Sequence, residues 1–149
     1  TASFDLVTSF DVLYEKGVMQ EIKALKEFFR VLTPNGKLLL RLPAYDWLRG
    51  SHDEQVHTNR RYTKKLVNDL LKQSGFIVEH ISYANTFLFP LAVIKRLSEK
   101  LFPSKIQSDL TLETGILNEI FKHILASEAG IISKFRMPYG LSIVAVARK

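Results

Sequence analysis

The chain has 149 residues, of which 46% are hydrophobic and 24% charged, a balance typical of one soluble globular domain with a real core. It has no cysteine, which excludes disulfides and thiolate metal sites and fits a cytoplasmic location. The formal charge is +6, but the basic clusters are not interleaved with aromatic residues, so we expect no nucleic-acid partner. The longest apolar stretch, residues 87–94, is too short to cross a bilayer.

The first 43 residues predict a strand, a helix and a second strand. Residues 4–10 are an apolar run typical of a buried strand. Apolar residues then recur at helical spacing, and these are Val18, Ile22, Leu25, Phe29 and Leu32. We expect Thr33-Pro34-Asn35-Gly36 to end this helix, with a left-handed turn at asparagine-glycine. Residues 37–42, closed by Pro43, predict a strand covered on both faces.

The middle of the chain predicts a loop, a helix and a third strand. Residues 43–62 are polar and lack periodicity, which indicates a long loop. Thr63 can cap a helix that Gly75 ends. The apolar face of that helix is Leu66, Val67, Leu70 and Leu71. Residues 76–83 predict a strand that Glu79 and His80 leave partly exposed.

Two more helices and a last strand follow. Pro90 begins a helix with an apolar side, and the residues of that side are Leu91, Ile94, Leu97 and Leu101. A second amphipathic helix carries apolar residues from Ile116 to Leu125 and ends near Gly130. Residues 141–147 are apolar almost throughout and predict a central strand. The alternation of strands and helices predicts an α/β sheet with right-handed crossovers.

The patterns FDLVTSFDVLYE (4–15), RVLTPNGKLLLRLP (30–43) and a helix ending in GF (75–76) resemble class I, Rossmann-like S-adenosylmethionine-dependent methyltransferases of the type 11 kind. RVLTPNGKLLL is the most specific piece and is similar to the RVLKPGG pattern of that family. HDEQVHTNRRYT (52–63) looks like a subgroup with His-Asp, His and Arg-Arg-Tyr after the fifth strand. The resemblance implies parallel strands, an antiparallel last strand ending in residues 146–149, and S-adenosylmethionine as the cofactor.

The resemblance covers most of the chain but only the second half of the family's domain. Neither a Gly-x-Gly loop nor the strand with the ribose-binding acid has a counterpart in these residues. Residues 1–149 would then be the C-terminal part of a methyltransferase domain, and we expect them alone to bind the cofactor weakly or not at all and to be inactive. Residues 86–138 would be a helical insertion or lid before the last strand, which leaves the acceptor open.

The candidate cofactor residues follow the first strand, because ligands of open α/β sheets bind outside the carboxyl ends of strands. They are Ser9, Phe10, Asp11 and Leu13. Backbone groups of Ser9 and Phe10 can meet the amino-acid end of the cofactor, and Leu13 or Tyr14 can pack near the adenosine. The resemblance supports Phe10 and Asp11, and the alternative is that Asp11 only caps the following turn.

The candidate catalytic residues lie in the loop that follows the second strand. His52, Asp53 and His57 combine imidazole with a carboxylate, which is a workable general base for a hydroxyl acceptor near neutral pH. The alternative is a surface loop whose histidines bind backbone. We predict no metal site, because the five-residue gap does not place both histidines on one helical face.

The candidate substrate-binding residues are Tyr45, Trp47, Arg60, Tyr62, Tyr83 and Asn85. A guanidinium such as that of Arg60 matches a phosphate or carboxylate on a small-molecule acceptor, with a glycan or a lipid-linked intermediate as candidates. The alternatives are a salt bridge of the arginines to Asp53, Glu54 or Asp69 and core packing of the aromatic rings.

Two other functions stay open. The first strand lacks its usual neighbour, so a non-catalytic interaction module could pair through that edge as a homodimer, or a helix could cover it. Residues 86–105 mix a hydrophobic face with lysine and arginine, which suits contact with a membrane surface. For that segment we favour an amphipathic lid packed on the sheet.

Overall fold

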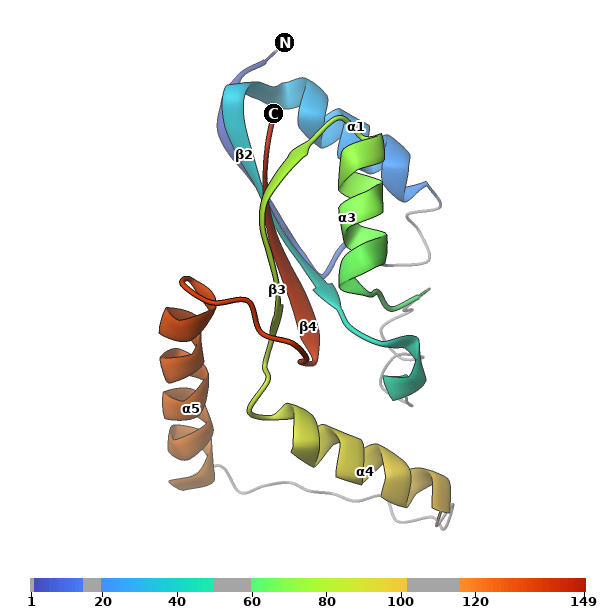
Figure 1. Ribbon diagram of the computed structural model, residues 1–149, viewed down its shortest axis with the longest axis vertical. Helices are drawn as coiled ribbons and strands as arrows, with labels where there is room; N and C mark the ends of the chain where they lie inside the picture. The colour runs from blue at the N-terminus through green and yellow to red at the C-terminus, as the bar shows by residue number, and fades with distance from the viewer. Residues whose placement is uncertain (1, 15–19, 50–59, 102–115) are drawn as a thin grey trace.

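A computed structural model of the protein describes residues 2–14, 20–49, 60–101 and 116–149 (Figure 1). Its elements are β1 (Phe4–Phe10), α1 (Glu21–Val31), β2 (Leu32–Pro43), a short 3-10 helix η1 (Asp46–Leu48), α3 (Lys64–Gln73), β3 (Ile77–Ala84), α4 (Phe89–Leu101), α5 (Ile116–Ile132) and β4 (Ser142–Arg148). The order of strands and helices predicted from the sequence is confirmed.

The four described strands form one sheet in the order β1-β2-β4-β3. β1 pairs with β2 in parallel, whereas β4 is antiparallel to both β2 and β3. The antiparallel last strand and its central place are therefore confirmed. Because β1, β2 and β3 run in the same direction, their carboxyl ends meet at one edge of the sheet. We call this the carboxyl edge, made of residues 10–11, 43–45 and 84–85.

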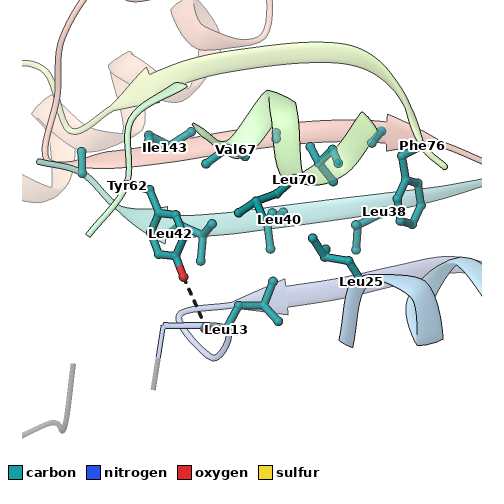
Figure 2. Packing of buried hydrophobic residues seen from close by; sticks show 14 of the residues in the cluster. Leu13, Leu25, Leu38, Leu40, Leu42, Tyr62, Val67, Leu70, Phe76 and Ile143 are labelled. Atoms are coloured by element: carbon teal, nitrogen blue, oxygen red, sulfur yellow. Dashed lines mark hydrogen bonds between the residues drawn. The ribbon is translucent and has the colours of Figure 1, made fainter. Parts of the chain in front are cut away.

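The core lies between the sheet and the helices α1 and α3, which lie against β2 and β3 and contact each other (Figure 2). Leu38, Leu40 and Leu42 point into it from β2 and are almost fully buried. Lys37 and Arg41 alternate with them and are exposed. The expectation that this strand is covered on both faces is therefore wrong for the described residues, because its period-two alternation presents charged side chains on the second face.

The junction between α1 and β2 differs in detail from the expected turn. α1 ends at Val31 and β2 begins at once with Leu32, so Thr33-Pro34-Asn35-Gly36 lies within the strand. The pairing with β1 jumps from Phe4↔Leu32 to Leu6↔Lys37, which accommodates these four residues as an irregularity of β2. Asn35 has φ 66°, so the left-handed turn predicted there is confirmed.

α3 confirms its predicted signals at both ends. The hydroxyl of Thr63 accepts a hydrogen bond from the backbone N–H of Leu66 at 3.3 Å, which satisfies one free donor of the first turn. Gly75 follows the helix with φ +96°, a conformation that suits glycine. Val67 and Leu71 are buried against the sheet as the periodicity predicts.

α4 and α5 together occupy the predicted helical insertion, but α4 is not a lid packed on the sheet. Figure 1 shows α4 beyond the ends of the strands, on the side of the carboxyl edge. Leu91, Ile94 and Leu97 are 56%, 64% and 52% exposed, so the apolar side of this helix faces away from the core. Hydrophobic periodicity predicted the helix correctly but could not say which side meets the protein. None of the described helices is long and apolar enough to span a membrane.

Candidate functional site

The carboxyl edge concentrates unusual backbone conformations. Asp11, Tyr45 and Asn85 have φ of 55°, 55° and 59°, and each follows the end of β1, β2 or β3 by one or two residues. Positive φ is uncommon outside glycine and costs free energy, so such residues cluster where the surrounding structure imposes a conformation, often at ligand sites. Three strand ends therefore turn sharply at the place where open α/β sheets bind ligands.

Asp11 is held by β2. Arg41 Nε donates to Asp11 Oδ2 at 2.8 Å, its second guanidinium nitrogen contacts the same oxygen, and the backbone N–H of Asp11 donates to the Arg41 carbonyl at 3.1 Å. Asp11 Oδ2 is thus held in an ion pair with Arg41, a contact that neither the predicted cofactor role nor the alternative turn cap included. The Arg41 guanidinium also lies 5.7 Å from the centre of the Phe10 ring. Sequence analysis missed Arg41, whose signal is a lone charge inside an apolar strand.

The other candidate cofactor residues differ in how much surface they offer. Ser9 is only 5% exposed, within the parallel pairing of β1 and β2. The Phe10 side chain is 48% exposed and so presents a ring face at the edge. Leu13 is 3% exposed and belongs to the core, and its carbonyl accepts the Tyr62 hydroxyl at 3.5 Å (Figure 2). Leu13 can therefore meet a ligand mainly through its backbone.

Glu21 organises the residues before α3. The Tyr62 hydroxyl donates to Glu21 Oε1 at 2.7 Å, and Arg60 donates to Glu21 Oε2 at 2.5 Å. Burial, followed by the hydrogen bond to Glu21, raises the pKa of Tyr62. Tyr62 is 1% exposed, so the structure gives this predicted substrate residue a place in the core. Arg60 pairs with Glu21, which sequence analysis missed because it lies 39 positions away. Of the acids considered from the sequence, Asp53 and Glu54 lie outside the described residues.

An aromatic cluster lies beyond the carboxyl ends of β2 and β3. The Tyr45 ring stacks on the Tyr83 ring at 5.0 Å and lies 5.8 Å from Trp47 and 5.7 Å from Phe89. Phe89 also contacts the Tyr139 ring at 5.3 Å. Burial, followed by the hydrogen bond with Tyr83, raises the pKa of Tyr45. Three predicted substrate residues, Tyr45, Trp47 and Tyr83, are therefore brought together, and two further rings join them.

The cluster combines buried and accessible rings. Tyr83 is 6% exposed, whereas Trp47 is 49% exposed. The Lys64 ammonium lies 4.8 Å from the centre of the Tyr83 ring and donates to the Met137 carbonyl at 3.2 Å. Tyr83 is therefore a buried member of the cluster, and Trp47 is an exposed ring that a ligand can reach.

Asp46 fixes the turn that carries Tyr45 and Trp47. Its carboxylate accepts the Arg61 backbone N–H at 3.1 Å and the Arg49 guanidinium at 2.8 Å. Burial acts to raise the pKa of Asp46, but the hydrogen bonds from Arg61 and Arg49 outweigh it, so the pKa lies below its ordinary value. These bonds favour the charged carboxylate and hold η1 against the residues before α3.

Asn85 begins a turn that α5 supports. The Asn85 amide donates to the Ser142 hydroxyl at 3.4 Å. The next N–H, that of Thr86, donates to Glu128 Oε1 at 2.7 Å, and the Thr86 hydroxyl donates to the Tyr139 carbonyl at 2.6 Å. Glu128 is 1% exposed. It was not singled out from the sequence, where its only signal is an acid on the apolar helix α5.

The predicted catalytic residues His52, Asp53 and His57 lie outside the described residues, as does Glu54. Their roles stay predictions. Within the described ranges no group of three metal-ligating side chains comes together. The expectation that there is no metal site stays a prediction, because it concerned His52, Asp53 and His57.

Comparison with known proteins agrees with this geometry. Residues 1–40 match the family model described as a methyltransferase domain. A sequence search of curated proteins finds no match. Solved structures match over nearly the whole chain, and they have the Rossmann-like fold of class I methyltransferases, which confirms the fold implied by the resemblance.

Three of these structures illustrate the likeness. The chain is 13% identical to an S-adenosylmethionine-dependent methyltransferase from Mesorhizobium loti, with a TM-score of 0.56, covering 99% of this chain and 62% of that one. It is 14% identical to a SAM-dependent methyltransferase from Archaeoglobus fulgidus, with a TM-score of 0.55, and the match covers 99% of this chain and 60% of that one. It is 17% identical to phosphoethanolamine N-methyltransferase 2 from Haemonchus contortus, in complex with S-adenosyl-L-methionine, with a TM-score of 0.50, and the match covers 98% of this chain and 33% of that one. The chain therefore spans between a third and about three fifths of these proteins.

Proposed function

We propose that this chain forms the carboxyl half of an S-adenosylmethionine-dependent methyltransferase domain, with the cofactor and a small-molecule acceptor meeting at the carboxyl edge. The observation that carries the proposal is the parallel pairing of β1 with β2, in which Phe10 lies opposite Arg41. This pairing brings the ends of both strands to the same edge, where nucleotide-type sheets bind their ligands. The match of residues 1–40 to a methyltransferase domain supports it.

The residues at the end of β1 fit one part of such a cofactor. The Phe10 ring offers a half-exposed flat surface beside the Arg41 guanidinium, which suits an adenosyl group or the polar end of the molecule. Asp11, whose carboxylate is taken by Arg41, acts as a positioning residue that holds the turn. When bound, S-adenosylmethionine supplies a methyl group on a positively charged sulfur.

The residues after β2 and β3 suit the acceptor. Trp47 and Tyr45 present aromatic surface at the edge, and Asn85 adds a polar side chain from the end of β3. This combination suits an acceptor with a ring or an apolar face, such as a glycan or a lipid-linked intermediate. The proposed role of His52 and His57, with Asp53, is to take the proton from an acceptor hydroxyl. Alignment of the acceptor with the methyl donor accelerates the reaction further.

Ligand-observed saturation-transfer NMR on this chain tests the cofactor class. We expect weak but specific signals from S-adenosylhomocysteine that S-adenosylmethionine displaces and that ATP at the same concentration does not. The binding is expected to be weak because these residues include no glycine-rich loop. Equal displacement by ATP, or a signal that S-adenosylmethionine does not displace, contradicts the assignment.

A second candidate function is an interaction module that pairs with a second copy through β1. In the described part of the chain β1 is an outer strand, and Phe4 and Leu6 are 57% and 56% exposed on it. Unpaired strand edges favour association with another strand. Analytical ultracentrifugation of the chain and of Leu6→Lys tests this: a dimer that the substitution dissociates supports the module, and a monomer at all concentrations contradicts it.

A further inference from the structure

α4 is oriented with its apolar side outward. Leu91, Ile94 and Leu97 recur every three residues, lie on one side of the helix and are each more than half exposed. Surface helices of globular proteins normally show the reverse arrangement, with the apolar side buried and the polar side in water. Three adjacent large aliphatic side chains in water form a contiguous apolar patch, which on a protein surface indicates an interaction site.

The opposite side of α4 is anchored to the body of the protein. The Phe89 ring packs against the rings of Tyr45, Trp47 and Tyr139, at 5.7, 6.2 and 5.3 Å. Near the middle of the helix, Arg96 Nε donates to the Leu48 carbonyl at 3.0 Å. These contacts fix which side of α4 faces outward, so the exposure of its apolar side follows from attachment at two points.

The charge carried by the described side chains of α4 is positive. Among residues 89–98, Lys95 is exposed next to Ile94, Arg96 carries a second positive charge, and no side chain is acidic. The Phe87 ring, two residues before the helix, is 48% exposed. Aliphatic side chains, aromatic rings and cations together are the composition of helices that lie in a membrane interface.

We propose that the outward side of α4 binds an anionic membrane surface, with Leu91, Ile94 and Leu97 entering the boundary between headgroups and acyl chains. A lipid surface accounts for both observations, because its headgroups attract the cations and its acyl chains accept the aliphatic side chains. A second copy of the chain fits less well, since a twofold contact through this side would bring the two Lys95 ammonium groups together. This inference does not depend on the methyltransferase proposal.

Vesicle co-sedimentation tests the proposal. The chain is expected to sediment with phosphatidylglycerol–phosphatidylcholine vesicles and to remain in solution with phosphatidylcholine alone. The double variant Ile94→Gln, Leu97→Gln should weaken binding by about tenfold or more, because both side chains lose their apolar contact with the bilayer. Both residues are exposed, so the fold, followed by circular dichroism, should be unchanged.

Two matched controls separate this surface from general adsorption. Ile77→Gln changes an aliphatic side chain of similar exposure (55%) at the start of β3 and should leave binding unchanged. Lys95→Glu should weaken binding to anionic vesicles, whereas Lys26→Glu on α1 should have a smaller effect.

Three results would overturn the proposal. One is the absence of sedimentation with anionic vesicles. Another is binding by the double variant that equals that of the natural sequence or of Ile77→Gln. The third is a dimer, seen by analytical ultracentrifugation without lipid, that the double variant dissociates, because that would make α4 an interface between copies.

Discussion

The Tyr62 hydroxyl donates a 2.7 Å hydrogen bond to Glu21 Oε1, across 41 positions of the chain. Glu21 is the first residue of α1, and Tyr62 forms an isolated β-bridge with Ala44, next to the end of β2. The Tyr62 side chain is almost fully buried. A part-buried polar contact therefore links the start of α1 to the residues between the carboxyl edge and α3.

Replacing Tyr62 by phenylalanine removes this bond and keeps the ring. We expect Tyr62→Phe to lower the free energy of unfolding by about 1–2 kcal/mol, because Glu21 Oε1 loses its donor in a part-buried place. Chemical denaturation measures the change. Tyr139→Phe is the control, because that side chain is 44% exposed, and it should cost little. Equal effects of the two substitutions would show that the hydrogen bond contributes nothing measurable.

Gly140 allows α5 and β4 to meet the turn after β3. A Cβ built there would lie 2.2 Å from the Ala84 carbonyl oxygen, which is backbone at the carboxyl edge. We expect Gly140→Ala to destabilise the protein by about 2–4 kcal/mol, because the backbone must move. Gly130→Ala on α5 is the matched control, since its Cβ meets nothing within 4 Å, and it should stabilise by about 0.5–1 kcal/mol. Thermal and chemical unfolding compare the two variants, and a tolerated Gly140→Ala would contradict the close approach.

The Asp46 turn should respond to acid. Its pKa is lowered in the folded protein, so the charged carboxylate stabilises the turn above the pKa of an unfolded aspartate, about 3.9. That stabilisation is lost as the pH falls below this value and through the folded pKa. Trp47 is the only tryptophan and lies next to Asp46, so its fluorescence should change in this range.

Two variants locate that acid transition. Asp46→Asn should remove the change in Trp47 emission, since the amide does not titrate. Glu27→Gln alters another carboxyl of lowered pKa, paired with Arg30 on α1, and should leave the change in place. An acid transition that survives in Asp46→Asn would assign it to another group.

Local sequence signals predicted the elements well. Thr63 and Gly75 marked the two ends of α3 correctly, because a hydroxyl cap and a left-handed glycine each act within one turn of the chain. The continuous apolarity of residues 141–147 predicted the central strand because β4 is paired on both sides. The parallel and antiparallel arrangement, in contrast, came from the resemblance, since no local pattern specifies strand direction.

The site was predicted less completely because its contacts join distant parts of the chain. Sequence analysis singled out Asp11 and Arg60 but could not identify their partners Arg41 and Glu21, which lie 30 and 39 positions away. It predicted α4 from its period but assumed that an apolar side is a buried side. The contacts of Phe89 and Arg96 determine which side of α4 faces outward, and neither contact can be recognised from the hydrophobic periodicity of the sequence.

The most direct test of the account is an amide-resolved NMR titration of this chain with S-adenosylhomocysteine. The account predicts that the largest shifts fall at the carboxyl edge, on Ser9, Phe10 and Asp11 and then on Tyr45, and that Arg41→Gln reduces them. Residues at the opposite edge, such as Lys37 and Ile77, should not move. Shifts centred on that opposite edge, or shifts that Arg41→Gln leaves unchanged, would contradict cofactor binding at the ends of β1 and β2.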